Sequence, residues 1–338
     1  MKSILKIKNW QLLKARGLEG KVTLSKGEFV AIGARAFSGK HNRYIESVTV
    51  PEGVTVIKAE AFEECKNLRT VILPTDGNIG LSQGVFAGCT RLREVANSER
   101  INSIGANAFA GCDSLQRIEF GKDLHRIGEG AFSGCRSLAA VSFPSGIREI
   151  GEGAFAECQE LAFYTAPDTL STLSSEMFRD CVSLREVVIP AAVTAIPWGA
   201  FMGCISLREV KIPANVQTIE ARAFENCRRL HTVKMELGIK ELGAHVFVNT
   251  PALREVYVPH SLKKLGRGAF GRGKRKDGEV ITVCVKNEYM VRRMKRLLFW
   301  CGSAKCTDVK LVGKSIEERK RERRRANVDA KGTHLIEK

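Results

Sequence analysis

Residues 127–135 read IGEGAFSGC, and close relatives of this string recur along the chain. The segments 104–112, 150–158 and 219–227 read IGANAFAGC, IGEGAFAEC and IEARAFENC. The first two spacings between successive copies are 25 and 24 residues, and every later one is 23. A fixed period of this length indicates a repeat solenoid and not two globular domains. Aligned on its Phe, the unit occurs eleven times, at positions 37, 62, 86, 109, 132, 155, 178, 201, 224, 247 and 270.

Each unit can be interpreted as one coil that begins with a strand. The segment LREVVIP at 184–190 is repeated as LREVKIP at 207–213. The alternation of Val187 and Ile189 predicts a strand whose apolar side faces inward, and a Pro is tolerated at the strand end. The chain then turns, contributes another apolar pair and reaches the AF-x-x-C segment. This segment is long enough only for turns or a single turn of helix, with 3₁₀ geometry the expectation.

The combined pattern, L-x-x-V-x-I-P-x-x-V-x-x-I-x-x-x-A-F-x-x-C, resembles the BspA-like class of leucine-rich repeats from about Ile32 to Val285. The resemblance implies a right-handed coil with a concave parallel β-sheet. We therefore expect an α/β repeat solenoid with short turns, 3₁₀ or helical pieces on its convex side, roughly 50 Å long at one strand spacing per coil. The resemblance also implies surface-displayed binding or adhesion proteins without shared catalytic residues.

The ends of a solenoid must be capped, which divides the chain into four parts. We assign residues 1–31 to an N-terminal cap and 32–279 to the eleven repeat units. Residues 280–312, with strand-like sequence on either side of a helix-like middle, form the predicted C-terminal cap. Residues 313–338 are a basic tail, expected to be flexible or helical.

The charge of the chain is uneven. Of the net charge of +17, a surplus of nine comes from residues 286–338, which hold 16 Lys/Arg and 7 Asp/Glu. The first 20 residues lack the apolar run of a secretion signal, and no stretch approaches the about 20 apolar residues of a membrane span. We therefore expect a cytoplasmic protein without a membrane span, and the family resemblance supplies a cell-surface location as the alternative.

The repeated Phe and Cys invite a chemical interpretation, but packing explains them better. Ligands one coil apart form a row, not a tetrahedral metal cluster, and parallel side chains do not converge as a disulfide requires. We expect no metal and no cofactor, with each Cys filling space beneath a buried Phe and Gly128 and Gly134 serving as turn residues. Cys301 and Cys306 lie outside the column, as free thiols or a local pair. The column consists of Cys65, Cys89, Cys112, Cys135, Cys158, Cys181, Cys204 and Cys227.

A binding site is expected where the strands vary, at the two outward positions that flank each buried Val. Phe163 is then an exposed aromatic residue, the type enriched at protein-binding hot spots, although a slipped register would turn it inward. The predicted partner-binding residues on the concave face are Phe163, Thr165, Glu186, Val188, Glu209, Lys211, Lys234, Glu255 and Tyr257.

A row of arginines precedes these positions. It could form a basic rail for an acidic partner or phosphate backbone, but the adjacent glutamates favour a surface ladder of Arg–Glu pairs between coils. The row consists of Arg69, Arg93, Arg185, Arg208 and Arg254.

Two basic segments lie near the C-terminus. Residues 289–300, YMVRRMKRLLFW, are expected to cover the last coil. The segment 314–325 has seven Lys/Arg and three Glu without an apolar stripe, so it is a candidate for contact with nucleic acid or another anion. The predicted contact residues are Arg319, Lys320, Arg321, Arg323, Arg324 and Arg325.

An enzyme is not expected. The six histidines are scattered, and the glycine-rich segment 271–278 lacks the spacing of a phosphate-binding loop. The leading hypothesis is a non-catalytic scaffold that binds a protein partner through the concave face. The alternatives are a nucleic-acid- or ribosome-associated protein that uses the basic tail, and a cell-surface adhesion protein.

Overall fold

The computed structural model describes residues 4–311 except Gly17, Lys26, Glu28, 39–41, Arg43, Ala166, Asp168, 272–279 and 305–306. The predicted tail at 313–338, its six candidate anion contacts and Cys306 therefore lie outside the described residues, as does almost all of the loop 271–278.

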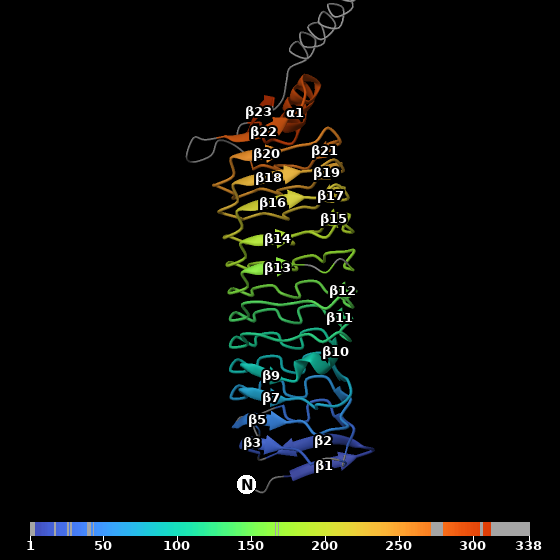
Figure 1. Cartoon of the computed structure of the whole chain (residues 1–338). Helices are drawn as coiled ribbons and strands as arrows, with labels where there is room; N and C mark the ends of the chain where they lie inside the picture. Colours follow the sequence, from blue (N-terminus) through green and yellow to red (C-terminus); the bar gives the residue numbers. More distant parts are fainter. Residues whose placement is uncertain are drawn as a thin grey trace, which may run out of the picture.

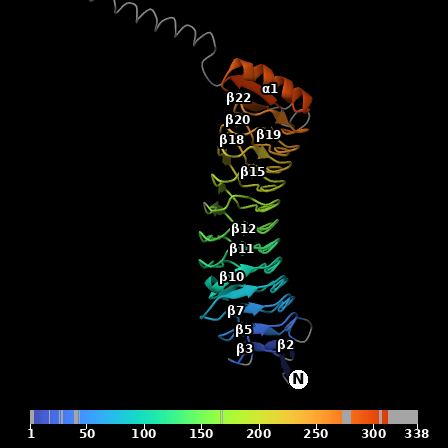
Figure 2. The same ribbon diagram turned by 90° about the vertical axis from the view of Figure 1, so that its right-hand side faces the viewer.

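The chain winds into a stack of coils that forms an elongated rod (Figure 1). Seen from the side, the rod bows gently (Figure 2). Nearly all strand pairs are parallel and join residues one repeat apart, such as Val210 with Val233 and then Val256. Each coil therefore contacts mainly the coil before it and the coil after it, which is the organisation of a solenoid.

The strands predicted from the L-x-x-V-x-I pattern, with one strand before them and two after them, form what we call the main ladder, at the left of Figure 1. Residues 117 and 140 continue it through an isolated parallel bridge. Its strands are β3 (Gly20–Thr23), β5 (Ile45–Thr49), β7 (Thr70–Ile72), β9 (Glu94–Ala96), β13 (Phe163–Thr165), β14 (Glu186–Val188), β16 (Glu209–Ile212), β18 (Thr232–Met235), β20 (Glu255–Tyr257), β22 (Ile281–Val285) and β23 (Thr307–Leu311).

A second parallel ladder, which the sequence did not reveal, runs along another side of the coils. It is built mostly from two-residue strands that end at the apolar residue before the AF-x-x-C segment. It starts from an antiparallel hairpin of β1 (Ile4–Lys8) and β2 (Gln11–Arg16). Its other strands are β4 (Ala31–Ile32), β6 (Val56–Ile57), β8 (Ile79–Leu81), β10 (Ile101–Ile104), β11 (Arg126–Ile127), β12 (Glu149–Ile150), β15 (Ala195–Ile196), β17 (Thr218–Ile219), β19 (Glu241–Leu242) and β21 (Lys264–Leu265).

The expected α/β class with helical pieces on the convex side is not confirmed. The regular helices in the described part of the chain are α1 (Glu288–Trp300) in the C-terminal region and the short 3₁₀ helix η2 (Ser98–Arg100). The AF-x-x-C segments are successive turns, which was one of the expected forms. Gly130 and Gly134 adopt φ angles of +56° and +73°, and a left-handed residue every four positions interrupts any helix.

These turns bind each coil to the next through the backbone. Gly130, Phe132 and Gly134 donate N–H hydrogen bonds to carbonyls of the following coil, each at 2.8 Å. Alternate N–H groups close the turns within the coil, as when Cys135 donates to Phe132 at 3.1 Å. The turn side is therefore a third face on which coils are joined by regular hydrogen bonds, although it contains no strand among the described residues.

Gly128 and Gly134, both predicted to be turn residues, serve different purposes. Gly134 is a turn residue, as expected, because of its positive φ. Gly128 has no such φ, and its role is close approach: a Cβ added there would lie 2.5 Å from the backbone N of Ala106 in the preceding coil. Gly151 repeats the arrangement one coil later, with a Cβ 2.4 Å from the N of Glu129.

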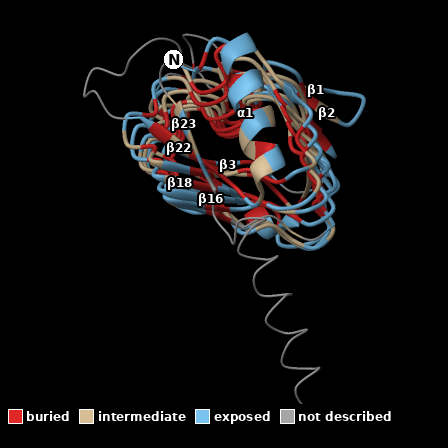
Figure 3. Cartoon of the chain, turned by 90° about the horizontal axis from the view of Figure 1, so that it is seen from above, coloured by how far each residue is buried: buried red, intermediate tan, exposed pale blue. Residues whose placement is uncertain are grey.

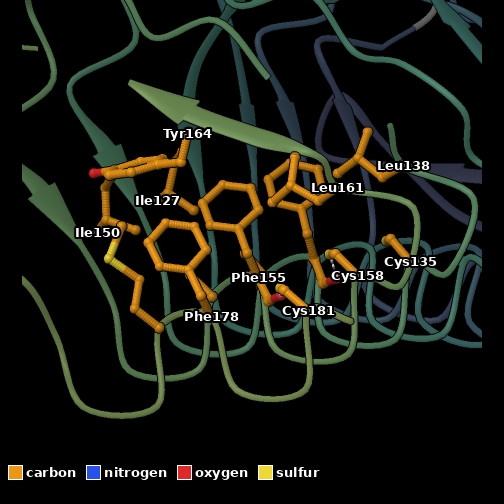
Figure 4. Close-up of a cluster of buried hydrophobic side chains, with 14 of the residues drawn as sticks. Ile127, Cys135, Leu138, Ile150, Phe155, Cys158, Leu161, Tyr164, Phe178 and Cys181 are labelled. Carbon is orange, nitrogen blue, oxygen red and sulfur yellow. Dashed lines mark hydrogen bonds between the residues drawn. The ribbon is translucent and has the colours of Figure 1, made fainter. Parts of the chain in front are cut away.

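The core is a continuous stack of phenylalanine rings along the rod. Successive rings of the repeated Phe are stacked with centroids 4.5–6.0 Å apart, and all eleven rings are buried. Figure 4 shows part of this stack, with Phe155 and Phe178 beside Tyr164 and the thiols of Cys158 and Cys181. Burying each ring stabilises the fold by a few kcal/mol.

At the C-terminal end, the segment after β22 takes the place of another coil. Helix α1 packs across the last coils (Figure 3) and is followed by β23, which pairs with β22. The Cys301 carbonyl accepts the N–H of Gly268 at 2.6 Å, and the Ser303 hydroxyl accepts the N–H of Phe270 at 3.2 Å. These are the N–H groups that a following coil would otherwise satisfy.

Candidate binding surface

The nine predicted binding residues all lie on five strands of the main ladder, where strand register arranges them in two rows. Phe163 is opposite Glu186, and Thr165 is opposite Val188. Further along, Glu209 is followed by Thr232 and Glu255, and Lys211 by Lys234 and Tyr257. The rows are outward-facing because the residues between them are buried: Tyr164, Val187, Val210, Val233 and Val256.

The structure decides between the two registers that the sequence allowed at Phe163. Its side chain is 58% exposed, whereas Tyr164 is buried and contacts the Phe178 ring at a centroid distance of 4.4 Å. Val188, in the neighbouring coil, is 49% exposed. The Thr165 side chain lies outside the described ones. Phe163 and Val188 therefore present apolar surface on adjacent strands, β13 and β14.

Charged and hydroxyl groups on the same face are partly engaged with one another. Lys234 Nζ contacts a carboxylate oxygen of Glu209 at 2.7 Å, and this hydrogen bond lowers the pKa of Glu209. The Tyr257 hydroxyl donates to Glu255 at 2.9 Å, which raises the pKa of the tyrosine. Tyr257 is partly buried, so it offers less surface than expected of an outward position.

A groove lies on this face where the hydrogen-bonded ladder is interrupted. Strands β13 and β14 form a two-stranded sheet, and β16 begins a separate five-stranded one. Between β14 and β16 is an open groove of about 530 Å³. A smaller groove of about 150 Å³ occupies the equivalent interruption between β9 and residues 117–119. The larger groove is lined by Arg185, Glu186, Val187, Val188, Ile189, Arg208, Glu209, Lys211, Pro213 and Glu236.

Two members of the predicted arginine row contribute to this groove. Arg185 and Arg208 line the groove beside Glu186 and Glu209. Arg254 is partly buried and donates to the Pro251 carbonyl at 2.7 Å. Among the nine binding residues, Lys234 forms an ion pair with Glu209 of the preceding coil, and Lys234 does not belong to the arginine row. The groove thus carries both charge signs next to apolar side chains.

The cysteine column lies on the turn side, away from these rows, and its thiols are free and buried. Each sulfur lies near the carbonyl of a Phe in the preceding coil, at 3.1–3.6 Å. Sequence reasoning predicted the packing but missed this thiol donor. Burial raises the pKa of Cys65 to about 12 and raises that of Cys135 as well, which keeps them protonated and unreactive.

Within the described part of the chain, no group of three or more His, Cys, Asp or Glu side chains is arranged to hold a metal ion. Cys301 is a buried free thiol, and its carbonyl accepts the Gly268 N–H of the last coil. No helix among the described residues is both long and apolar enough to cross a bilayer.

The repeat matches the model of the BspA type leucine rich repeat region over residues 30–162, 75–185 and 151–275. The chain therefore belongs to the BspA-type leucine-rich repeat family. This match does not indicate a catalytic family. A comparison with curated proteins finds no match.

Two solved structures show the same fold over almost the whole chain. A leucine-rich repeat protein from Bacteroides ovatus is 19% identical, covering 92% of this chain and 98% of its own, with a TM-score of 0.58. The pneumococcal vaccine antigen PcpA is 16% identical, covering 92% of this chain and 96% of its own, with a TM-score of 0.54. At these identities the likeness concerns the fold. The family match gives no support to the cytoplasmic location expected from the sequence.

Proposed function

We propose that this chain is a non-catalytic scaffold that binds a protein partner on the main ladder, centred on the groove between β14 and β16. The observation that carries the proposal is the combination of exposed Phe163 and Val188 with a charged groove on strands held by a rigid core. Aromatic side chains beside a concavity are typical anchors of protein interfaces, and the surrounding charges provide orientation and specificity.

The strands that carry this groove support the proposed location in two ways. The inward residues of the five strands are buried, so substitutions at the outward positions change the surface and leave the core intact. The groove also opens at a break in the ladder, where backbone groups are not all used between strands. A partner segment can therefore meet side chains and main chain at the same place.

The test is capture of a partner from native lysate by the full chain, followed by affinity measurement with purified components. Phe163→Ala and Val188→Ala are expected to weaken binding by about 30-fold for a hot-spot residue. Ile72→Ala is the matched control, because Ile72 is outward on β7, in the same row as Val188 but far along the ladder. Equal affinity of wild type, Phe163→Ala and Val188→Ala would exclude the groove as the centre of binding.

Family membership favours one second setting, a binding or adhesion protein at the cell surface. The scaffold role is the same in both settings, and location separates them. We expect protease treatment of intact cells to degrade a surface-displayed chain, whereas complete protection would reject this setting.

The nucleic-acid alternative rests on Arg319, Lys320, Arg321 and Arg323–Arg325. Binding through these residues should weaken steeply as salt rises and should ignore Phe163→Ala. Binding at the groove should depend much less on salt and should be weakened by Phe163→Ala.

A further inference from the structure

Helix α1 covers the last coil with one face, but this role does not explain the residues on its outer face. Its inner side buries Met290, Met294 and Leu298, which satisfies the role predicted from the sequence. On the other side, Tyr289 is 68% exposed, Phe299 70% and Trp300 78%. Three large aromatic side chains are thus left in solvent on one helix of 13 residues.

Basic side chains lie among these aromatic residues. Residues 289, 292, 296 and 299 follow one another at intervals of three and four, so Tyr289, Arg292, Arg296 and Phe299 share one helix face. Lys295 and Trp300 are exposed beside them. The one acidic residue of α1 is Glu288 in its first turn, against four basic residues, so the helix carries a positive surplus. We call the surface of Tyr289, Arg292, Lys295, Arg296, Phe299 and Trp300 the cap face.

The cap face lies at one end of the solenoid. Helix α1 lies across the C-terminal end of the rod, and much of its ribbon carries the colour of exposed residues (Figure 3). No described coil projects past it on that side (Figure 1). A flat, extended partner can therefore reach the cap face without meeting the body of the solenoid.

We propose that the cap face docks on an anionic lipid bilayer, with the aromatic rings at the headgroup level and the basic side chains against acidic headgroups. Trp and Tyr favour the membrane–water interface, and each Lys or Arg near an anionic surface contributes to attraction. This inference is independent of the function proposed for the main ladder.

Two other occupants fit the cap face less well. A second copy of the chain would bring Arg292, Lys295 and Arg296 against the same residues, with like charges opposed. Successive nucleic-acid bases need ring faces on which to stack, but the Phe299 and Trp300 rings are crossed at 81° with centroids 6.1 Å apart. Crossed rings are no obstacle to insertion among lipid headgroups.

Tryptophan fluorescence of the full chain tests the proposal directly. The chain has three tryptophans, at 10, 198 and 300, so Trp10→Phe with Trp198→Phe leaves Trp300 as the only reporter. Phosphatidylcholine vesicles with about 30 mol% phosphatidylserine should shift its emission to the blue, and vesicles of phosphatidylcholine alone should not. An unchanged emission with the anionic vesicles overturns the proposal, and this measurement leaves α1 unaltered.

Cosedimentation with the same vesicles identifies the residues responsible. The double variants Phe299→Ala/Trp300→Ala and Arg292→Glu/Arg296→Glu should each partition about tenfold more weakly. Trp10→Ala, at an exposed tryptophan in the hairpin at the opposite end, is the matched control and should bind as the wild type does. Circular dichroism and melting temperature confirm that each variant is folded.

Two results would contradict the lipid assignment. Full vesicle binding by both double variants would place the attraction in the basic tail and not on α1. Quenching of Trp300 by a single-stranded oligothymidylate, without any response to vesicles, would assign the cap face to nucleic acid.

Discussion

The turn side and the main ladder of the same coils follow opposite rules. On the turn side, Phe and Cys recur unchanged from Phe62 and Cys65 to Phe224 and Cys227. On the main ladder, equivalent outward positions change from Phe163 to Glu186 to Thr232. A buried side chain in a stack is packed between copies of itself, so one self-compatible residue suits every coil. An outward side chain meets solvent or a partner, and it is free to differ.

The largest expected effect on stability comes from the ring stack. Phe132→Ala should lower the free energy of unfolding by about 3–5 kcal/mol, because it removes a buried ring stacked on Phe109 and Phe155 at 5.1 and 5.3 Å. Phe163→Ala, an exposed ring on the ladder, should change it by less than about 0.5 kcal/mol. Urea unfolding followed by circular dichroism measures both, and equal losses would refute the distinction between the two sides.

The glycines allow a finer comparison within the turn side. Gly128→Ala should cost about 1–3 kcal/mol, because its Cβ would collide with the backbone of the preceding coil. Gly134→Ala should cost about 1 kcal/mol, because its φ of +73° is strained for Ala but its Cβ would have 3.6 Å to the nearest atoms. Thermal unfolding of the two variants tests the order, and a less stable Gly134→Ala would reverse our assignment of their roles.

The cysteine column predicts a smaller change in stability and a clear chemical signature. Cys135→Ala should cost about 1 kcal/mol, since it removes the contact of Sγ with the Phe109 carbonyl at 3.2 Å. The raised thiol pKa values also predict that the eight cysteines of the column resist a thiol reagent at mildly alkaline pH until urea unfolds the chain. Rapid labelling of the native column would show that these thiols are accessible.

The smallest effect is expected on the ladder itself. Lys234→Met breaks the exposed pair with Glu209 and should change stability by less than about 1 kcal/mol. The pKa of Glu209 is lowered in the folded chain, so the contribution of the pair is present above the unfolded pKa and lost as pH falls through the folded one. Chemical unfolding of wild type and variant at neutral and acidic pH checks this: the difference should disappear in acid.

Features that depend on residue identity were accessible from the sequence. The period, the inward columns and the outward position of Glu186 and Val188 all follow from which side chains recur. The second ladder was not accessible, because a two-residue strand such as Arg126–Ile127 is too short to show alternation. The AF-x-x-C segments form the predicted short turns but no helix, because left-handed positions recur in them: the same position is occupied by Gly134 in one coil and by Glu157 or Asn226 in others.

The candidate site was predicted only in part for a related reason. Side-chain patterns located the two rows, and the exposure of Phe163 agrees with one of the two registers considered. The groove depends on the missing backbone pairing between β14 and β16, although LREVVIP and LREVKIP differ at one residue. Pairing between coils is set by their relative placement along the whole stack, which no single repeat encodes.

The ending at Cys301 and Ser303 has a consequence for the length of the molecule. The N–H groups of the last turn donate hydrogen bonds to these two residues, whereas the equivalent N–H groups of internal coils donate to carbonyls of the following coil. Duplicating one internal 23-residue unit should therefore extend the rod by about 4.8 Å and leave both ends unchanged. Gain or loss of whole repeats can therefore change the distance between the N-terminal hairpin and the cap face in steps of one coil.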